Sequence, residues 1–167
     1  MDTRRGPRSW WVAAAIAVAA LAACGGAKGD DGREEGFKER LANIVETASS
    51  RYGELGERAG SVNPNAPLAD DFKAQMRAVA VGDRRAADQI EALTPRQAGA
   101  ELLIQQLGAA LRTRAAAFER AAGPTTITLR QLEEEGSITE AGEQIDHVVQ
   151  KLRQAGFLAD EQPHNEP

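Results

Sequence analysis

The chain has 167 residues, with 25 Asp and Glu against 20 Lys and Arg, which gives a formal net charge of −5. Nucleic acids and anionic lipid headgroups are bound by clusters of Lys and Arg, so this acidic balance argues against both as electrostatic partners. Cys24 is the single cysteine, which excludes a disulfide within the chain and leaves packing alone to stabilise the fold.

The first 24 residues have the three parts of a secretory signal peptide. Three arginines within residues 4–8 form a basic region, residues 10–23 form an apolar stretch, and small residues precede Cys24. The apolar stretch is shorter than the roughly 20 residues that a membrane-spanning helix needs. Residues 21–24 read Leu-Ala-Ala-Cys, which resembles the lipobox of bacterial lipoproteins.

This resemblance implies that Cys24 carries a diacylglyceryl group and becomes the first residue after cleavage. Two acyl chains anchor a protein stably to a membrane, so the expected location is the extracytoplasmic face of the cell membrane. Removal of residues 1–23 leaves 144 residues, with 17 basic and 24 acidic side chains and a formal charge of −7. The alternatives are an ordinary signal peptide with a chance cysteine and a twin-arginine signal. Gly6-Pro7 stand where a twin-arginine signal prefers a polar and then an aromatic residue, which favours ordinary secretion.

Residues 24–33 are predicted to be the lipidated cysteine and a flexible tether, because they are small, polar and rich in Gly and Asp. The first helix is predicted over residues 34–59, followed by a loop over residues 60–66. Apolar or aromatic residues recur there at steps of three and four, which places them on one helical face: Phe37, Leu41, Ile44, Val45, Ala48, Tyr52, Leu55 and Ala59.

A second helix is predicted from Pro67, which suits a first helical position, to Leu93, and Gly82 is expected to loosen its centre. Its inner face contains one polar exception, Asp83, among Phe72, Met76, Val79, Ala86, Ile90 and Leu93. A third helix is predicted from Pro95 to Ala122, with Thr94 as its cap. Its predicted inner face consists of Leu103, Leu107, Leu111, Ala115, Phe118 and Ala122.

The last part of the helical domain, which is predicted to span residues 34–158, cannot be one straight helix. Leu132 and Ala141 would point in nearly opposite directions at about 100° per residue. We therefore predict a short helix over residues 126–135, a break at Gly136, a capping box of Ser137 with Glu140, and a long helix over residues 138–155.

Gly156 is the expected C-cap of that last helix, and residues 159–167 are expected to fray. The pattern as a whole predicts an all-α fold, an antiparallel four-helix bundle with a short extra helix before the last long helix.

No residue of the predicted bundle carries a convincing catalytic or metal-binding motif. Glu143 and His147 share a helix face, but a di-iron bundle uses two Glu-x-x-His pairs with further carboxylates. Met76 with His147 would be the only haem ligand pair, and a Met on a core stripe ordinarily fills space. The acidic run of residues 133–135 lacks the alternation of a calcium loop. Several arginines are read as ordinary helix surface: Arg84, Arg85, Arg112, Arg114 and Arg120.

We therefore expect a non-enzymatic envelope lipoprotein that binds another envelope protein, without cofactor, metal or catalytic residues. The chain also resembles the small, alanine-rich helical lipoproteins of high-GC actinobacteria, most of which have no assigned activity. The alternative is a small-ligand or metal carrier with a pocket between the helices, which would turn Asp83, Tyr52 or His147 inward. A third hypothesis, an enzyme, would need converging carboxylates such as Glu140 and Glu143 opposite a second helix.

Overall fold

The computed structural model describes residues 31–93 and 98–159. The signal peptide, the lipidation site Cys24, the tether up to residue 30, the corner at Thr94-Pro95 and the tail from residue 160 lie outside the described residues. Within the two described ranges, no helix combines the length and the hydropathy that crossing a membrane requires.

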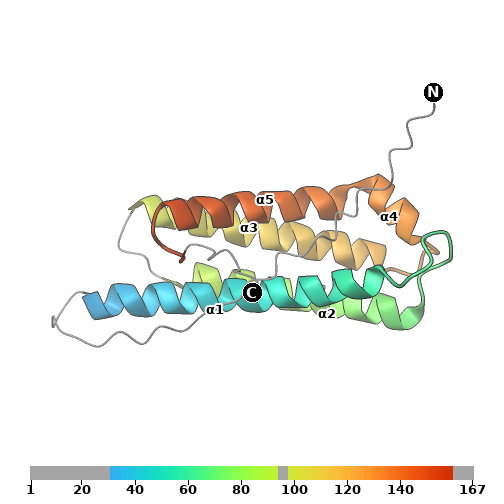
Figure 1. Ribbon diagram of the computed structural model, residues 1–167, viewed down its shortest axis with the longest axis horizontal. Coiled ribbons are helices and arrows are strands. Elements are labelled where there is room, and N and C mark those ends of the chain that lie inside the picture. The colour runs from blue at the N-terminus through green and yellow to red at the C-terminus, as the bar shows by residue number, and fades with distance from the viewer. Residues whose placement is uncertain (1–30, 94–97, 160–167) are drawn as a thin grey trace, which may run out of the picture.

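The described residues form four long helices and one short one, and their only β-pairing is an isolated bridge between Pro67 and Thr128. The elements are α1 (Asp31–Ala59), α2 (Asp70–Glu91), α3 (Ala98–Ala121), α4 (Leu129–Glu135) and α5 (Ser137–Gln154). The long helices alternate in direction along the chain (Figure 1). The predicted antiparallel four-helix bundle with a short extra helix is confirmed.

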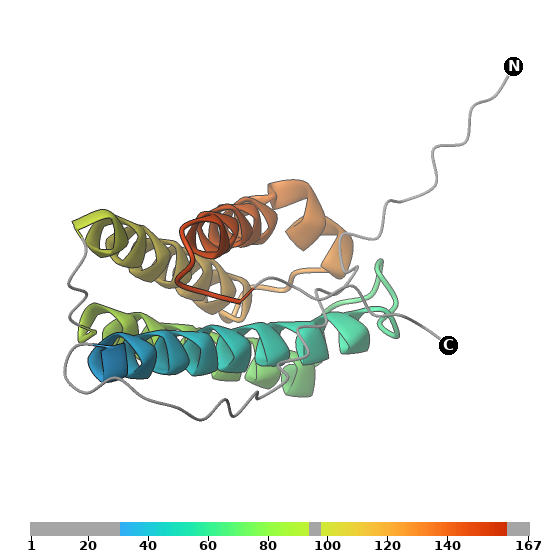
Figure 2. The ribbon, with the colours of Figure 1, turned by 60° about the vertical axis from the view of Figure 1, so that its left-hand side comes forward.

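The bundle has two layers, one made of α1 with α2 and the other of α3 with α5 (Figure 2). The tightest pair is α2 with α3, followed by α3 with α5 and α1 with α2. All seven residues of the predicted inner face of α2 are buried, including Asp83. On α3 the prediction was wrong by one position near the N-terminus, because Ile104 is buried and Leu103 only partly so.

Pro67 is not the first residue of α2, contrary to the prediction. The backbone N–H of Leu68 donates to the carbonyl of Ile127 at 2.9 Å, which holds this segment against the α3–α4 connection. The helical bonds begin with the N–H of Lys73 donating to Ala69 at 3.0 Å, so α2 starts only at Asp70. Helix α1 is longer than predicted at its N-terminal end, because it begins at Asp31 and not at residue 34.

The break between α4 and α5 lies at Gly136, as predicted, but its capping differs from the prediction. Gly136 has a φ of 72° and is both the C-cap of α4 and the N-cap of α5. Ser137 therefore lies inside α5, and its hydroxyl donates to the Glu135 carboxylate at 3.3 Å instead of capping. A capping box exists one helix earlier, where Thr128 and Gln131 bond each other's backbone N–H groups, and α4 starts at Leu129.

The last helix ends one residue earlier than predicted, because its C-cap is Ala155 and not Gly156, and the turn at Gly156 closes one end of the core. Gly156 has a φ of 75°, which allows the N–H of Phe157 to donate back to the carbonyl of Leu152 at 2.9 Å. This turn places the ring of Phe157 edge-on against Phe37 of α1, with the ring centroids 6.1 Å apart.

Gly136→Ala should lower the free energy of unfolding by about 1–2 kcal/mol, because an L-residue is strained at this positive φ. The matched control is Gly53→Ala within α1, where an added Cβ meets no atom within 4 Å. That control should raise the stability by up to about 1 kcal/mol through helix propensity. Urea unfolding followed by circular dichroism measures both, and equal effects would contradict the role of Gly136.

Candidate functional site

A buried ion pair joins α2 to α3 at the middle of the bundle. The side chain of Asp83 on α2 is 1% exposed and that of Arg114 on α3 is 4% exposed. The guanidinium donates from Nε to Oδ2 at 2.8 Å and from Nη2 to Oδ1 at 2.9 Å, which is a bidentate pair. The prediction that Arg114 lies on the helix surface was wrong, because the residue is buried. Arg114 follows Leu111 by three residues and precedes Phe118 by four, which places it on the buried stripe of α3.

Tyr52 of α1 extends this ion pair to the other two helices. The Cζ atom of Arg114 lies 4.5 Å from the centroid of the Tyr52 ring, a cation–π contact. On the α5 side, a Cβ added to Gly142 would lie 3.6 Å from the Tyr52 hydroxyl. Tyr52, Asp83 and Arg114 thus form a polar layer that all four long helices surround.

The environment of Tyr52 keeps its phenol protonated. Burial raises the pKa of Tyr52 above its ordinary value, and the negative charges of Asp146 and Asp83 raise it further, against the opposing effect of Arg114. A phenol with a raised pKa is neutral at physiological pH.

The polar layer separates the apolar core into two clusters of buried residues. The cluster toward Phe157 contains Leu41, Ile90, Leu107 and Leu152, and the cluster toward α4 contains Leu55, Phe72, Met76, Phe118 and Ile138. Both oxygens of Asp83 are occupied by Arg114. The polar interior that a carrier would use for a ligand is thus occupied by the protein's own side chains.

The structure does not bring the other candidate residues together. His147, Glu140 and Glu143 are exposed on α5, while Met76 is fully buried, so Met76 and His147 do not share a haem site. Of the acidic run, Glu133 is half-buried and the next two glutamates are exposed. Across the described ranges, no group of three or more His, Cys, Asp and Glu side chains is placed to hold a metal ion.

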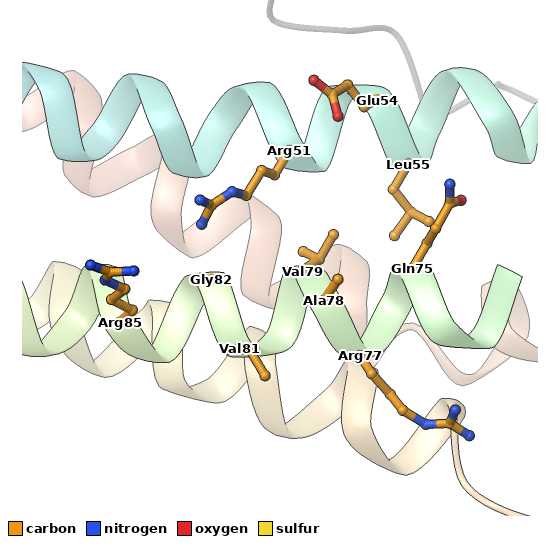
Figure 3. A pocket seen from close by; sticks show the side chains of 10 residues that line it. All are labelled: Arg51, Glu54, Leu55, Gln75, Arg77, Ala78, Val79, Val81, Gly82 and Arg85. Atoms are coloured by element: carbon orange, nitrogen blue, oxygen red, sulfur yellow. The ribbon is translucent and has the colours of Figure 1, made fainter. Parts of the chain in front are cut away.

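A groove on the outer surface between α1 and α2 is the second candidate site (Figure 3). It consists of a cavity of about 550 Å³ and a cavity of about 380 Å³. Both cavities are lined by Arg51, Gly82 and Arg85, which therefore mark the centre of this α1–α2 groove.

Gly82 allows the two helices to come together at this point. A Cβ added to Gly82 would lie 2.5 Å from Nη1 of Arg51, so only a glycine leaves room for the guanidinium in its present position. Figure 3 shows Arg51 reaching from α1 across to α2 at Gly82. Gly82 was expected to loosen the centre of the helix, but its position instead accommodates a side chain of α1.

The electrostatics of the groove differ from those of the neighbouring surface. Three nearby arginines form ion pairs. Arg58 pairs with Asp71, and Arg84 pairs with Glu119. Arg112 pairs with both Asp88 and Glu91. Arg51 and Arg85, in contrast, form no ion pair or side-chain hydrogen bond with any residue of the described ranges.

Apolar and unpaired polar groups accompany these two arginines. Val81, in the groove wall, is 65% exposed, which is unusual for a large apolar side chain of this bundle. Oε1 of Gln75, in the same wall, is buried and accepts no hydrogen bond from the described residues. Sequence reasoning missed the groove because each of these residues alone resembles ordinary helix surface.

No protein-family model matches the chain, and searches of curated proteins and of solved structures find no significant match. The class that fold and site define is an antiparallel helical bundle with a closed polar layer inside and a cationic groove outside.

Arg114→Met should lower the free energy of unfolding by about 3–5 kcal/mol, because it leaves the Asp83 carboxylate buried without a partner. Combining it with Asp83→Leu should recover most of this loss, since the pair is replaced by apolar groups. Urea unfolding of the two single variants and the double variant measures the coupling. Additive losses would show that the two side chains do not depend on each other.

The stability of the wild-type protein should fall as the pH rises above about 10, because the unfolded phenol ionises near 10.0 while the folded phenol of Tyr52 keeps its proton to higher pH. The Tyr52 contribution is thus fully present below the unfolded pKa and is lost through the folded pKa. Tyr52→Phe should remove this part of the pH dependence in urea unfolding. Parallel pH profiles of the two proteins would contradict the raised pKa.

Proposed function

We propose that the protein is a lipid-anchored, non-enzymatic interaction module of the bacterial cell envelope that binds another envelope protein through the α1–α2 groove. The observation that carries this proposal is the pairing pattern of the arginines. Arg51 and Arg85 meet at the centre of a groove without a carboxylate partner in the described residues, beside the exposed Val81.

The interior of the bundle favours this function over the carrier alternative. A ligand between the helices would have to displace Arg114 from Asp83, which leaves a buried charge without its partner. The apolar clusters on either side are filled by side chains that are almost fully buried. Binding at the outer surface needs no such rearrangement.

The proposed anchor limits where a partner can be. Only residues 25–30 separate Cys24 from Asp31, the first residue of α1. Even a fully extended chain of this length reaches no more than about 25 Å. A diacylglyceryl group on Cys24 would therefore keep the bundle at the membrane surface, and the partner would be a membrane protein or another protein held at that surface.

Cys24→Ala should move the protein from the detergent phase to the aqueous phase in a phase-partition experiment, because the variant has no thiol to receive the lipid. Membrane fractions of cells that produce the wild type or the variant provide a second readout. If the variant stays in the detergent phase, the lipid anchor at Cys24 is ruled out.

A photoreactive residue at Val81 of the full-length chain should give a crosslinked product of defined mass in cells. The matched control is the same residue at Leu102 of α3, which is 58% exposed but does not line the groove. Mass spectrometry of the product identifies the partner. No product at Val81, or the same products at both positions, would contradict the proposed interaction through the groove.

A further inference from the structure

The shape of the α1–α2 groove fits a segment of polypeptide better than a small molecule. Along α2 its lining extends from Gln75 to Gln89, which corresponds to roughly 20 Å of helix. An extended chain covers that length with about six residues. Small-molecule pockets enclose most of their ligand, whereas neither cavity of this groove is enclosed.

The charge of the groove is opposite to that of the molecule. From Cys24 onward the chain has a formal charge of −7, yet Arg51 and Arg85 line the groove against a single acid, Glu54. Arg77 also lines it, but points away from α1 in Figure 3 and donates to the carbonyl of Ala122 at 2.6 Å. Figure 3 shows Glu54 pointing away from α2 and Arg51 pointing toward it. Arg85 follows Gly82 by one helical turn, so the Arg51 and Arg85 side chains converge on one stretch of the groove.

Two further groups in the groove lack the contacts that a bound segment would supply. The apolar surface of Val81 and Ala78 is exposed, and Oε1 of Gln75 is buried without a donor. A buried acceptor without a donor costs free energy, and a backbone N–H of a bound segment would satisfy it. An anionic membrane surface would supply neither an apolar side chain nor a backbone N–H at these positions.

We infer that the α1–α2 groove binds an acidic peptide segment of a partner protein, whose carboxylates pair with Arg51 and Arg85 and whose apolar side chain packs beside Val81. This inference rests on the proposed function as an interaction module and specifies the chemistry of the partner. Arg–carboxylate pairs in such a groove supply orientation and specificity, and apolar contact supplies the remaining affinity.

The test uses the full-length protein in mild detergent and, as the probe, a displayed library of random short peptides. The selected peptides should be enriched in Asp and Glu next to an apolar residue. R51E combined with R85E should weaken the binding of a selected peptide by about tenfold or more, because attraction becomes like-charge repulsion. The single variant R85E, whose side chain has no described partner to lose, should weaken it in the same direction.

R120E on α3 is the matched control, since Arg120 is exposed, does not line the groove, and undergoes the same change of charge. It should leave the affinity unchanged, and circular dichroism should show equal helicity for all variants. A peptide whose acids are replaced by Lys should bind the double variant better than the wild type. Sedimentation measures the oligomeric state of the protein without peptide. R51E combined with R85E should leave that oligomeric state unchanged.

Selected peptides without acidic enrichment, or equal losses for R120E and the groove variants, would overturn the inference. Self-association through the groove would also overturn it, because the occupant would then be a second copy of the chain. These failures are distinguishable from failure of the proposed function. A crosslinked partner at Val81 without acidic selection would refute only the inferred chemistry, whereas acidic selection without a cellular partner would refute the proposed function.

Discussion

The arrangement of the helices depends on the bidentate pair between Asp83 and Arg114. A buried ion pair is weak evidence for stability, since removing two charges from water costs about as much as their attraction returns. What the pair supplies here is register. The apolar faces of α2 and α3 are both rich in Ala, a small residue that packs acceptably in more than one alignment. A shift of one helical turn between them would leave a carboxylate and a guanidinium both buried and unpaired, so one alignment is strongly preferred.

This register also sets the geometry of the outer surface, because adjacent residues serve the two sites. Asp83 points into the bundle toward α3, while the preceding residue, Gly82, faces α1 and accommodates the guanidinium of Arg51. On α1 the same adjacency recurs, since Tyr52 contacts Arg114 inside and Arg51 crosses the groove outside. The polar layer and the groove therefore lie at the same level of the bundle, and a change that shifts one helix at that level would alter both.

Much of the fold follows from the sequence, because each helix has an apolar face that can be recognised from spacing alone. Asp83 was identified as the exception on such a face, and the break at Gly136 followed from two stripes that no straight helix can bury. Arg114 was assigned to the surface because its charge was weighed more heavily than its position between Leu111 and Phe118. The capping box was placed at Ser137 because Ser-x-x-Glu is a capping pattern, but Gly136, with its positive φ, takes the N-cap position of α5 and leaves Ser137 inside the helix. The groove depends on which residues of α1 face which residues of α2, a relation that no local pattern contains.

The contrast between the two sites supports the proposed binding at the groove. An arginine in a buried bidentate pair could bind a ligand only by giving up its carboxylate partner. That exchange leaves the carboxylate buried without a partner, which costs free energy. Arg114 is in that state, as both of its described hydrogen bonds go to Asp83. Arg51 and Arg85 are in the opposite state: within residues 31–93 and 98–159 they have no ion-pair partner, apolar surface lies beside them, and the chain as a whole is acidic. The net acidic charge of the chain would repel an acidic partner, so the two arginines of the groove would both attract the proposed segment and orient it. In the proposed function, specificity would come from the placement of these two side chains, and the proposed lipid anchor would add the remaining constraint by restricting which proteins come within reach.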